Sequence, residues 1–170
     1  ITNTVKYVEE INTTSVNVFK YDGNTTTNVG LTGAGFTLNG EGSYVTDSDG
    51  KLSINILAAG DYKLKETNAP NGYSLDSHEY SFTAKKNFVS LEFDSTNKQY
   101  VCKYNLSLES EETNYVSSSR TFNIGNNPQT IDVDVTIIWD DNEDAEKKRP
   151  ESVDVQLYKV VEGSTDLVKV

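Results

Sequence analysis

The sequence holds a single cysteine, Cys102, so no disulfide can form within the 170-residue chain. A small β-rich domain without disulfides must gain its stability in another way. The only histidine is His78, which gives a Ser/His/Asp triad or a histidine metal cluster little to build on. No run approaches the ~20 apolar residues of a membrane helix. We therefore expect no membrane insertion of this chain, no cofactor and no resident metal.

Positive charge is scarce compared with negative charge. Lysine and arginine total 15 against 26 aspartates and glutamates, which gives a net charge of −11 and a pI of about 4.5. Nucleic acids and anionic membrane surfaces repel a chain of this charge. We therefore exclude both as partners.

Aromatic and β-branched residues are plentiful although the mean hydropathy is only −0.55. With 10 tyrosines and 6 phenylalanines, the composition is typical of a solvent-facing all-β protein and not of a disordered one. Short alternating segments follow one another with turn signals about every eight to twelve residues, which predicts a sandwich or barrel. The predicted strands cover residues 15–22, 36–38, 43–46, 52–56, 62–67, 79–83, 88–93 and 100–108.

Two charged side chains fall on predicted core faces. Glu66 follows Leu64 by two residues, on a strand whose opposite face carries lysines. An isolated carboxylate should not point into a core. Lys20 likewise follows Val16 and Val18 on one alternating face. A lysine whose ammonium reaches solvent near a strand end is the alternative for Lys20.

A third polar residue, Asn97, faces the same core if the alternation of the predicted strand 88–93 continues beyond that strand. In the predicted strand 88–93 the apolar face is Val89, Leu91 and Phe93, and steps of two from there lead to Asn97. Residues 94–97 equally fit a turn into the next strand.

The turn signals divide the chain into four parts. Residues 1–14 are a polar tail or the end of a preceding module, and residues 15–108 form the first β-module. Residues 109–130, rich in Glu, Ser and Asn, are predicted to be a linker or long loop. Residues 131–170 begin a second β-module that holds only two or three strands, so we expect the native protein to continue beyond it.

Several motifs resemble the Cna B-type, or SpaA-like pilin, domain of Gram-positive surface proteins. The strongest is YKLKETNAPNGY at residues 62–73, which is similar to the pilin E box at every fixed position. Further matching pieces are FKYD at 19–22, GAGFTL at 33–38 and TDSDGKL at 46–52. Residues 131–158 resemble the opening of another such repeat, through Trp139-Asp140-Asp141 and the RPESV run at 149–153.

The resemblance implies an immunoglobulin-like (prealbumin-like) β-sandwich with an isopeptide bond that forms without an external enzyme. In that family a first-strand lysine joins a last-strand asparagine or aspartate, assisted by a buried glutamate. By position Lys20 is the nucleophile, Glu66 the assisting acid and Asn97 the best match for the partner. Asn105 and Asp94 are the alternatives. Burial favours a neutral amine on the lysine and a neutral carboxyl on the glutamate, which suits this chemistry.

The second module departs from this pattern. Its relatives carry a lysine two residues before the tryptophan, where this chain has Ile137, so we expect no isopeptide bond there. Asp140, Asn142, Asp144 and Glu151 imitate a calcium-binding EF-hand loop. The loop lacks the required glycine and is crowded by lysines, and the family resemblance explains it better.

The resemblance implies a non-enzymatic structural stalk or shaft module of a pilin or cell-wall-anchored adhesin on the outside of a Gram-positive cell. Its partners would be neighbouring modules of the same surface protein or pilus. A second hypothesis is an adhesin module that binds a host extracellular-matrix protein or glycan through loops such as 23–35 or 109–130. A third, a β-sandwich appended to a hydrolase, lacks any catalytic constellation. An exposed apolar patch would favour the second hypothesis over the first.

Overall fold

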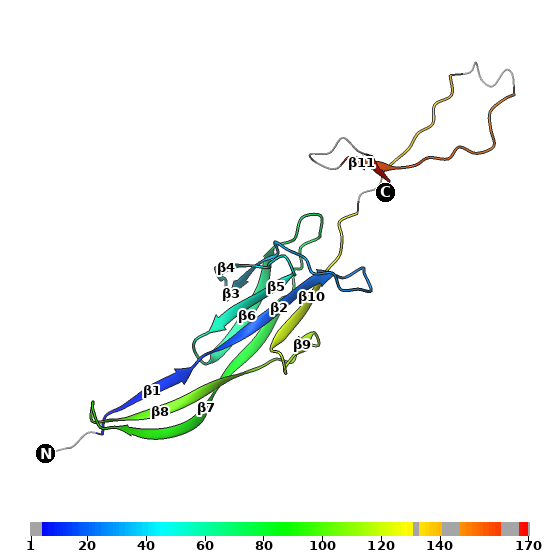
Figure 1. The fold of residues 1–170 in the computed structure, drawn as a ribbon. Helices are drawn as coiled ribbons and strands as arrows, with labels where there is room; N and C mark the ends of the chain where they lie inside the picture. Colours follow the sequence, from blue (N-terminus) through cyan, green and yellow to red (C-terminus); the bar gives the residue numbers. More distant parts are fainter. Residues whose placement is uncertain (1–4, 131–132, 141–146, 161–166, 170) are drawn as a thin grey trace. The chain divides into compact units, whose positions relative to one another are not determined.

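The computed structural model describes residues 5–130, 133–140, 147–160 and 167–169 (Figure 1). The chain divides into two units, Ile1–Ile131 and Asp132–Val170. Strands and loops make up the described parts of both, and within them no helix has the length and apolar character needed to cross a membrane.

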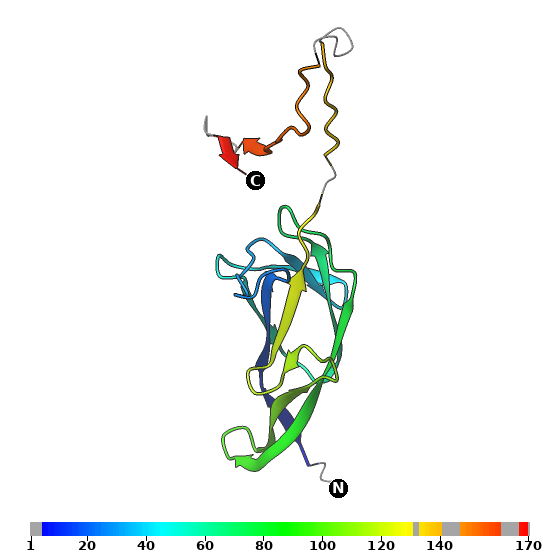
Figure 2. The ribbon, with the colours of Figure 1, turned by 90° about the vertical axis from the view of Figure 1, so that its right-hand side faces the viewer.

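The first unit is a sandwich of two sheets (Figure 2). One sheet has six strands in the order β1-β8-β7-β6-β3-β4, and the other has four in the order β5-β2-β10-β9. The strands are β1 (Tyr7–Asn12), β2 (Thr14–Asp22), β3 (Gly35–Leu38), β4 (Glu41–Val45), β5 (Lys51–Ile56), β6 (Gly60–Asn68), β7 (Glu79–Asp94), β8 (Gln99–Glu109), β9 (Tyr115–Val116) and β10 (Thr121–Asn126). The predicted all-β sandwich is confirmed.

The core lies between the two sheets and follows the alternation in the sequence. Every second residue of a strand faces the other sheet, so apolar residues at that spacing become buried together. The buried apolar residues are Val16, Val18, Leu31, Ala34, Phe36, Ile54, Ile56, Leu64, Tyr80, Phe82, Ala84, Leu106, Leu108, Phe122 and Ile124.

Residues 109–130, for which the sequence predicts a linker, instead contain β9 and β10. Strand β10 pairs in parallel with β2 and completes the four-stranded sheet. Phe122 and Ile124 are almost fully buried in the core. The loop-forming composition of the flanking residues hides the short alternation of this strand. Its parallel pairing also gives no local signal of which strand it joins.

The N-terminal segment is also more structured than a tail. Within residues 1–14, β1 pairs in parallel with β8 over Tyr7 to Asn12, and β2 begins at Thr14. Residues 1–4 lie outside the described residues. The chain passes at Thr13 from the six-stranded sheet to the four-stranded one.

Strand β7 is one continuous strand where the sequence predicts two. A bulge between Phe88 and Ser90 shifts its register against β8. A bulge inserts one extra residue and so exchanges the faces of the residues beyond it. Leu91 is paired with Cys102 of β8, and Phe88 is paired with Tyr104. Cys102 and Tyr104 are two residues apart and so share a face, which places Leu91 and Phe88 on one face as well.

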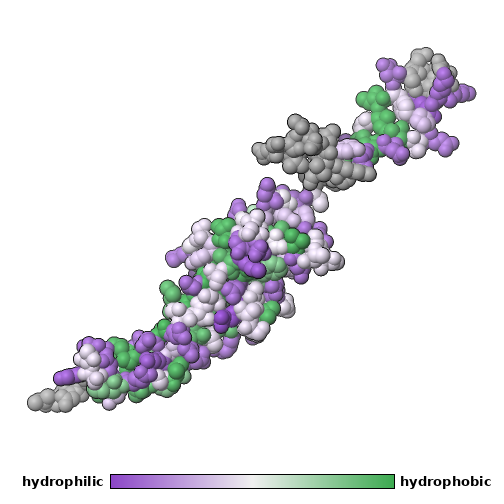
Figure 3. Space-filling model, viewed as in Figure 1, coloured by the Kyte–Doolittle hydropathy of each residue, from purple (hydrophilic) through white to green (hydrophobic). Residues whose placement is uncertain are grey.

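The part of the six-stranded sheet beyond the bulge carries exposed apolar side chains. Here β1 and the adjoining halves of β7 and β8 form a three-stranded extension, and Figure 3 shows hydrophobic residues interspersed with hydrophilic ones at this end of the unit. Tyr7, Phe88, Leu91 and Phe93 are each more than half exposed. We call this part the β1–β7–β8 extension.

The second unit does not form the predicted opening of another sandwich within its described residues. No strand is found in 133–140 or 147–157, where the alternation predicts two, and the short β11 (Tyr158–Val160) and β12 (Leu167–Lys169) pair in antiparallel. The side chains of 133–140 are exposed. An alternating segment needs a covering sheet to bury its apolar face, and the described residues of this unit provide none.

Candidate functional site

Three polar side chains meet inside the sandwich core: Lys20 of β2, Glu66 of β6 and Asn126 of β10. Their exposed fractions are 0%, 1% and 2%. Almost all fully buried side chains are apolar. Three buried polar residues in mutual contact therefore indicate a candidate functional site. We call these residues the buried triad.

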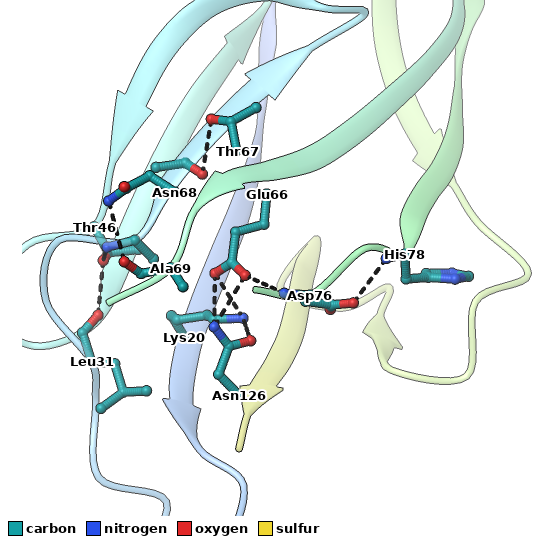
Figure 4. A network of polar contacts seen from close by, with 12 residues as sticks. Lys20, Leu31, Thr46, Glu66, Thr67, Asn68, Ala69, Asp76, His78 and Asn126 are labelled. Carbon is teal, nitrogen blue, oxygen red and sulfur yellow. Dashed lines mark hydrogen bonds and ion pairs between the residues drawn. The ribbon is translucent and has the colours of Figure 1, made fainter. Parts of the chain in front are cut away.

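Strand register explains why the triad converges. Lys20 lies on β2 directly opposite Ile124 of the parallel strand β10, and Asn126 lies two residues further on the same face. Glu66 approaches from the facing sheet, where it is paired with Phe36 of β3. All three side chains therefore point into the same space between the sheets (Figure 4).

The three side chains contact one another directly (Figure 4). The Lys20 ammonium nitrogen Nζ lies 3.1 Å from Oε1 of Glu66 and donates a hydrogen bond to Oδ1 of Asn126. The amide nitrogen Nδ2 of Asn126 lies 3.0 Å from both Oε1 and Oε2 of Glu66. Glu66 therefore accepts from the amide nitrogen of Asn126, and the amide carbonyl oxygen accepts from Lys20.

Burial changes the acid–base chemistry of Lys20. Removal from water lowers the pKa of Lys20 below its ordinary value of 10.5, although the neighbouring Glu66 carboxylate opposes this shift. The charged amine loses its hydration in the core, so the neutral form gains in population. The Phe36 ring, whose centroid lies 5.9 Å from Nζ, adds an apolar wall to the site.

A close backbone approach fixes the strand position of Lys20. Its N–H donates to the Gly50 carbonyl at 2.7 Å, and its carbonyl accepts from Leu31 N–H at 2.8 Å. Gly50 has φ +75°, and a Cβ atom there would overlap the Lys20 carbonyl oxygen. Only glycine combines this backbone conformation with this close approach.

The segment between β6 and β7, which includes the end of the E box, lies against the triad. The backbone N–H of Asp76 donates to Oε2 of Glu66 at 2.7 Å. Tyr73 donates through its hydroxyl to Asp22 at the end of β2, at 3.1 Å, and forms an isolated bridge with Pro128. The segment thus links β6 to the ends of β2 and β10, the strands that carry Lys20 and Asn126.

The residues predicted as cross-link partners lie elsewhere. Asn97 is exposed in the turn between β7 and β8, where its N–H and its amide Nδ2 donate to Asp94 at 3.2 and 2.7 Å. Asn105 is exposed and accepts from Asn12 at 3.2 Å. The structure brings Lys20 and Glu66 together as predicted, and the amide in contact with both is that of Asn126 and not of Asn97 or Asn105. Asn97 lies outside the core because β7 ends at Asp94 and the alternation cannot be continued through a turn.

The sequence did contain a signal for Asn126. Phe122, Ile124 and Asn126 alternate in the same way as Val18 and Lys20. The signal was lost because the segment is short and lies between Ser-rich and Asn-rich stretches that are typical of loops.

The triad contains an amine, a carboxyl group and a primary amide in mutual contact, away from solvent. These are the groups required to exchange one amide for another without a cofactor. Within the described residues no three His, Cys, Asp or Glu side chains are placed to hold a metal ion. Asn142 and Asp144 of the calcium-like loop lie outside the described residues.

Comparisons with known proteins agree with the fold. The family profile of the SpaA prealbumin-like fold domain matches residues 14–99, about half of the chain. No curated protein matches the sequence. The profile ends before β10, so it does not include Asn126.

Among solved structures, BcpA, the major pilin subunit of Bacillus cereus, is 24% identical with a TM-score of 0.38, over 59% of this chain and 29% of BcpA. The group B streptococcus pilus 2b backbone protein is 21% identical with a TM-score of 0.43, over 68% of this chain and 41% of that protein. GBS52, the minor pilin of Streptococcus agalactiae, is 22% identical with a TM-score of 0.43, over 74% of this chain and 48% of that protein. The chain therefore spans less than half the length of each of them.

Proposed function

This chain belongs to the SpaA family of prealbumin-like domains, and we propose that it is a structural module of a Gram-positive pilus or cell-wall-anchored surface protein. Its first unit is stabilised by an isopeptide bond between Lys20 and Asn126, formed with the help of Glu66. The observation that carries the proposal is the buried triad, in which amine, amide and carboxyl group are in contact and shielded from water. The module acts outside the cell, joined to neighbouring modules of the same protein or pilus.

The reaction begins with the neutral amine of Lys20. Burial lowers its pKa, which leaves a nitrogen lone pair free to attack Cγ of Asn126. The Glu66 carboxylate accepts the proton that leaves Nζ, across the 3.1 Å contact to Oε1. The same oxygen lies 3.0 Å from Nδ2, so one carboxyl oxygen serves both nitrogens.

The reaction ends with loss of ammonia. Glu66 passes the proton to Nδ2, the bond between Cγ and Nδ2 breaks, and the nitrogen leaves with its own two hydrogens and the transferred one. A new amide joins Nζ to Cγ, and Glu66 returns to its starting state. Holding the reactants in contact removes the entropy cost of bringing them together, an effect that reaches ~7–11 kcal/mol in well-aligned cases.

The product would stabilise the unit as a disulfide does. Lys20 and Asn126 are 106 residues apart in sequence, and the chain-entropy relation for a closed loop of about 100 residues gives ~4.7 kcal/mol. The two residues lie on adjacent parallel strands. Tension between the ends of the unit would pass from β2 through the bond to β10, and would bypass the residues in between.

The intact mass of the purified chain tests this proposal. We expect the wild type to be lighter than its sequence by one ammonia, and Lys20→Ala and Asn126→Ala to have their full masses. Asn97→Ala is the matched control and should still lose ammonia. Asn126→Asp should lose one water instead, because the leaving group becomes hydroxide plus a proton. Full mass in the wild type would contradict the cross-link.

A second candidate function, binding of a host extracellular-matrix protein, is favoured by the β1–β7–β8 extension. Tyr7, Tyr100 and Phe93 are opposite one another in the sheet, and all three are exposed. A patch of exposed aromatic side chains suits a protein partner better than solvent. Binding of the wild type to immobilised matrix proteins, abolished by Phe93→Ser and unaffected by Val45→Ser on β4, would support this function. If the wild type does not bind, the structural module is the only one of the two proposed functions that is left.

A further inference from the structure

Glu66 is held on the side facing away from Lys20 by the segment that follows the E box. Its oxygen Oε2 accepts the backbone N–H of Asp76 at 2.7 Å, the shortest contact that the carboxyl group makes. A hydrogen bond from a backbone N–H to a carboxylate is charge-assisted and therefore strong. The contact leaves Oε1 to serve both Lys20 and Asn126.

The side chain of Asp76 in turn holds its own backbone in place. One carboxylate oxygen accepts the N–H of His78 at 2.9 Å, and the other accepts the hydroxyl of Tyr80 at 2.6 Å. An aspartate that bonds the backbone two residues ahead stabilises a local turn. The turn aims the Asp76 N–H at Glu66 (Figure 4).

Tyr80 anchors this arrangement to the core. Its side chain is only 8% exposed, and its ring lies 5.6 Å from that of Phe122 on β10. Burial and the bond to Asp76 raise the pKa of Tyr80 above its ordinary value, so the hydroxyl remains a donor. Tyr80 also pairs with Leu64, two residues before Glu66, which ties the donor to the strand that carries the carboxyl group.

From these contacts we infer that Asp76 and Tyr80 are positioning residues for the cross-linking reaction. The Tyr80 hydroxyl fixes the Asp76 carboxylate, and the Asp76 N–H fixes Glu66 with Oε1 between the two reacting nitrogens. Neither residue touches the reacting atoms. The inference rests on the proposed cross-link and adds residues beyond the buried triad.

Loss of this support should slow the reaction and leave its product unchanged. A carboxyl group without the Asp76 contact rotates more freely, and misplacement by a fraction of an ångström lowers the rate of an oriented reaction. We expect roughly tenfold slower bond formation in Tyr80→Phe and in Asp76→Ala, in proportion to the loss of a hydrogen bond to a charged group. Both variants should still reach complete conversion, which also shows that they fold.

The experiment follows bond formation in the full-length chain during a short pulse of cell-free synthesis. Samples are quenched in acid at intervals, and intact mass gives the fraction that has lost ammonia. The matched control is Tyr115→Phe, because the ring of Tyr115 also packs on Phe122, at 4.8 Å, but its hydroxyl faces Leu108. This control should react at the rate of the wild type.

Two further variants separate positioning from general stability. Asp76→Asn keeps the shape of the side chain and one oxygen that can accept the N–H of His78, and its amide nitrogen can donate to the Tyr80 hydroxyl oxygen. It should recover most of the rate lost in Asp76→Ala. The double variant Tyr80→Phe/Asp76→Ala should be no more than about twofold slower than the slower single variant, because both changes break the same contact.

The outcomes distinguish this inference from the proposed function. If the wild type loses ammonia but Tyr80→Phe reacts at the same rate, the positioning role is wrong and the cross-link stands. Equal slowing in Tyr115→Phe would also overturn the positioning role, because it would assign the effect to the loss of a tyrosine hydroxyl in general and not to the bond with Asp76. If the wild type keeps its full mass, the cross-link itself is wrong and the positioning role with it.

Discussion

Strand β2 and the segment 133–139 carry the same alternation but have different environments. In β2, Val16 and Val18 are at most 1% exposed, whereas Val133 and Val135 are 50% and 58% exposed. Strand β2 is paired on both sides, with β5 and β10. Within the described residues, 133–140 belongs to no sheet.

The comparison shows that alternation specifies a face but does not bury it. Burial requires strands from distant parts of the chain. Those same strands bring in the partners that a buried lysine needs, because Asn126 lies 106 residues from Lys20 and 60 residues from Glu66. A lysine placed on an uncovered face would stay an ordinary solvated amine.

The largest expected effect comes from removing the acid in the buried triad. Glu66→Ala should prevent cross-linking and leave the Lys20 amine buried without its ion-pair partner, so the free energy of unfolding should fall by about 5 kcal/mol. Urea unfolding combined with intact mass measures both effects. Glu66→Gln keeps the volume and a polar partner, and should also block the bond but destabilise less. Bond formation in either variant would contradict the assigned role.

The next largest effect concerns the backbone that positions β2. Gly50→Ala should destabilise the first unit by about 3 kcal/mol, because the new Cβ meets the backbone around Lys20 and the positive φ is strained. Gly72→Ala is a matched control, since Gly72 also has positive φ, of +83°, but open space around its Cβ position. It should cost only about 1 kcal/mol. Thermal unfolding compares the two, and equal losses would show that the close approach at Lys20 is unimportant.

A smaller effect is the pH dependence of a variant that cannot cross-link. In Asn126→Ala the folded state keeps Lys20 buried with a lowered pKa, while the unfolded chain binds a proton up to the ordinary value of 10.5. The unfolded state then holds more protons, so stability should rise with pH towards 10.5 and fall at lower pH, by at most about 1.4 kcal/mol per pH unit. Urea unfolding at several pH values measures the slope. The same slope after adding Lys20→Met would show that other groups cause it.

The smallest expected effect is at the corresponding position of the second unit. Ile137→Lys restores the lysine of the family pattern but provides neither a buried carboxyl nor a buried amide. We expect no further loss of mass and a change in stability within about 0.5 kcal/mol, as for an exposed position. Loss of a second ammonia would show that an alternating segment with a lysine is sufficient for bond formation without a buried carboxyl and amide. The difference drawn between β2 and segment 133–139 would then be wrong.

The sequence predicts those residues of the site that belong to a local pattern of neighbouring residues. Alternation identified Lys20 and Glu66 as charged residues on core faces, and the E box supported the sandwich fold. The placement of Asn97 in the core was wrong, because counting by twos assumes an uninterrupted strand. The bulge at Val89 and the turn after Asp94, whose carboxylate accepts the N–H of Thr96 at 2.9 Å, both interrupt it.

Long-range pairing accounts for the rest. Strands β1 and β10 both join their sheets by parallel pairing with residues far away in sequence, and no local pattern specifies such a partner. The contact between Asp76 and Glu66 was likewise invisible, because a backbone N–H donor depends on chain geometry and not on residue type.

The most direct test of the central claim is a tryptic map of the purified wild-type chain. Because trypsin does not cut at a modified lysine, the Lys20–Asn126 bond predicts a branched product in which residues 7–51 are joined to residues 121–147, lighter than their sum by one ammonia. Fragmentation of this product should place the branch at Lys20 and Asn126. Separate linear peptides 7–20 and 121–147 would contradict the cross-link, and a branch between residues 7–51 and 87–98 would assign Asn97 as the partner and contradict the role of Asn126.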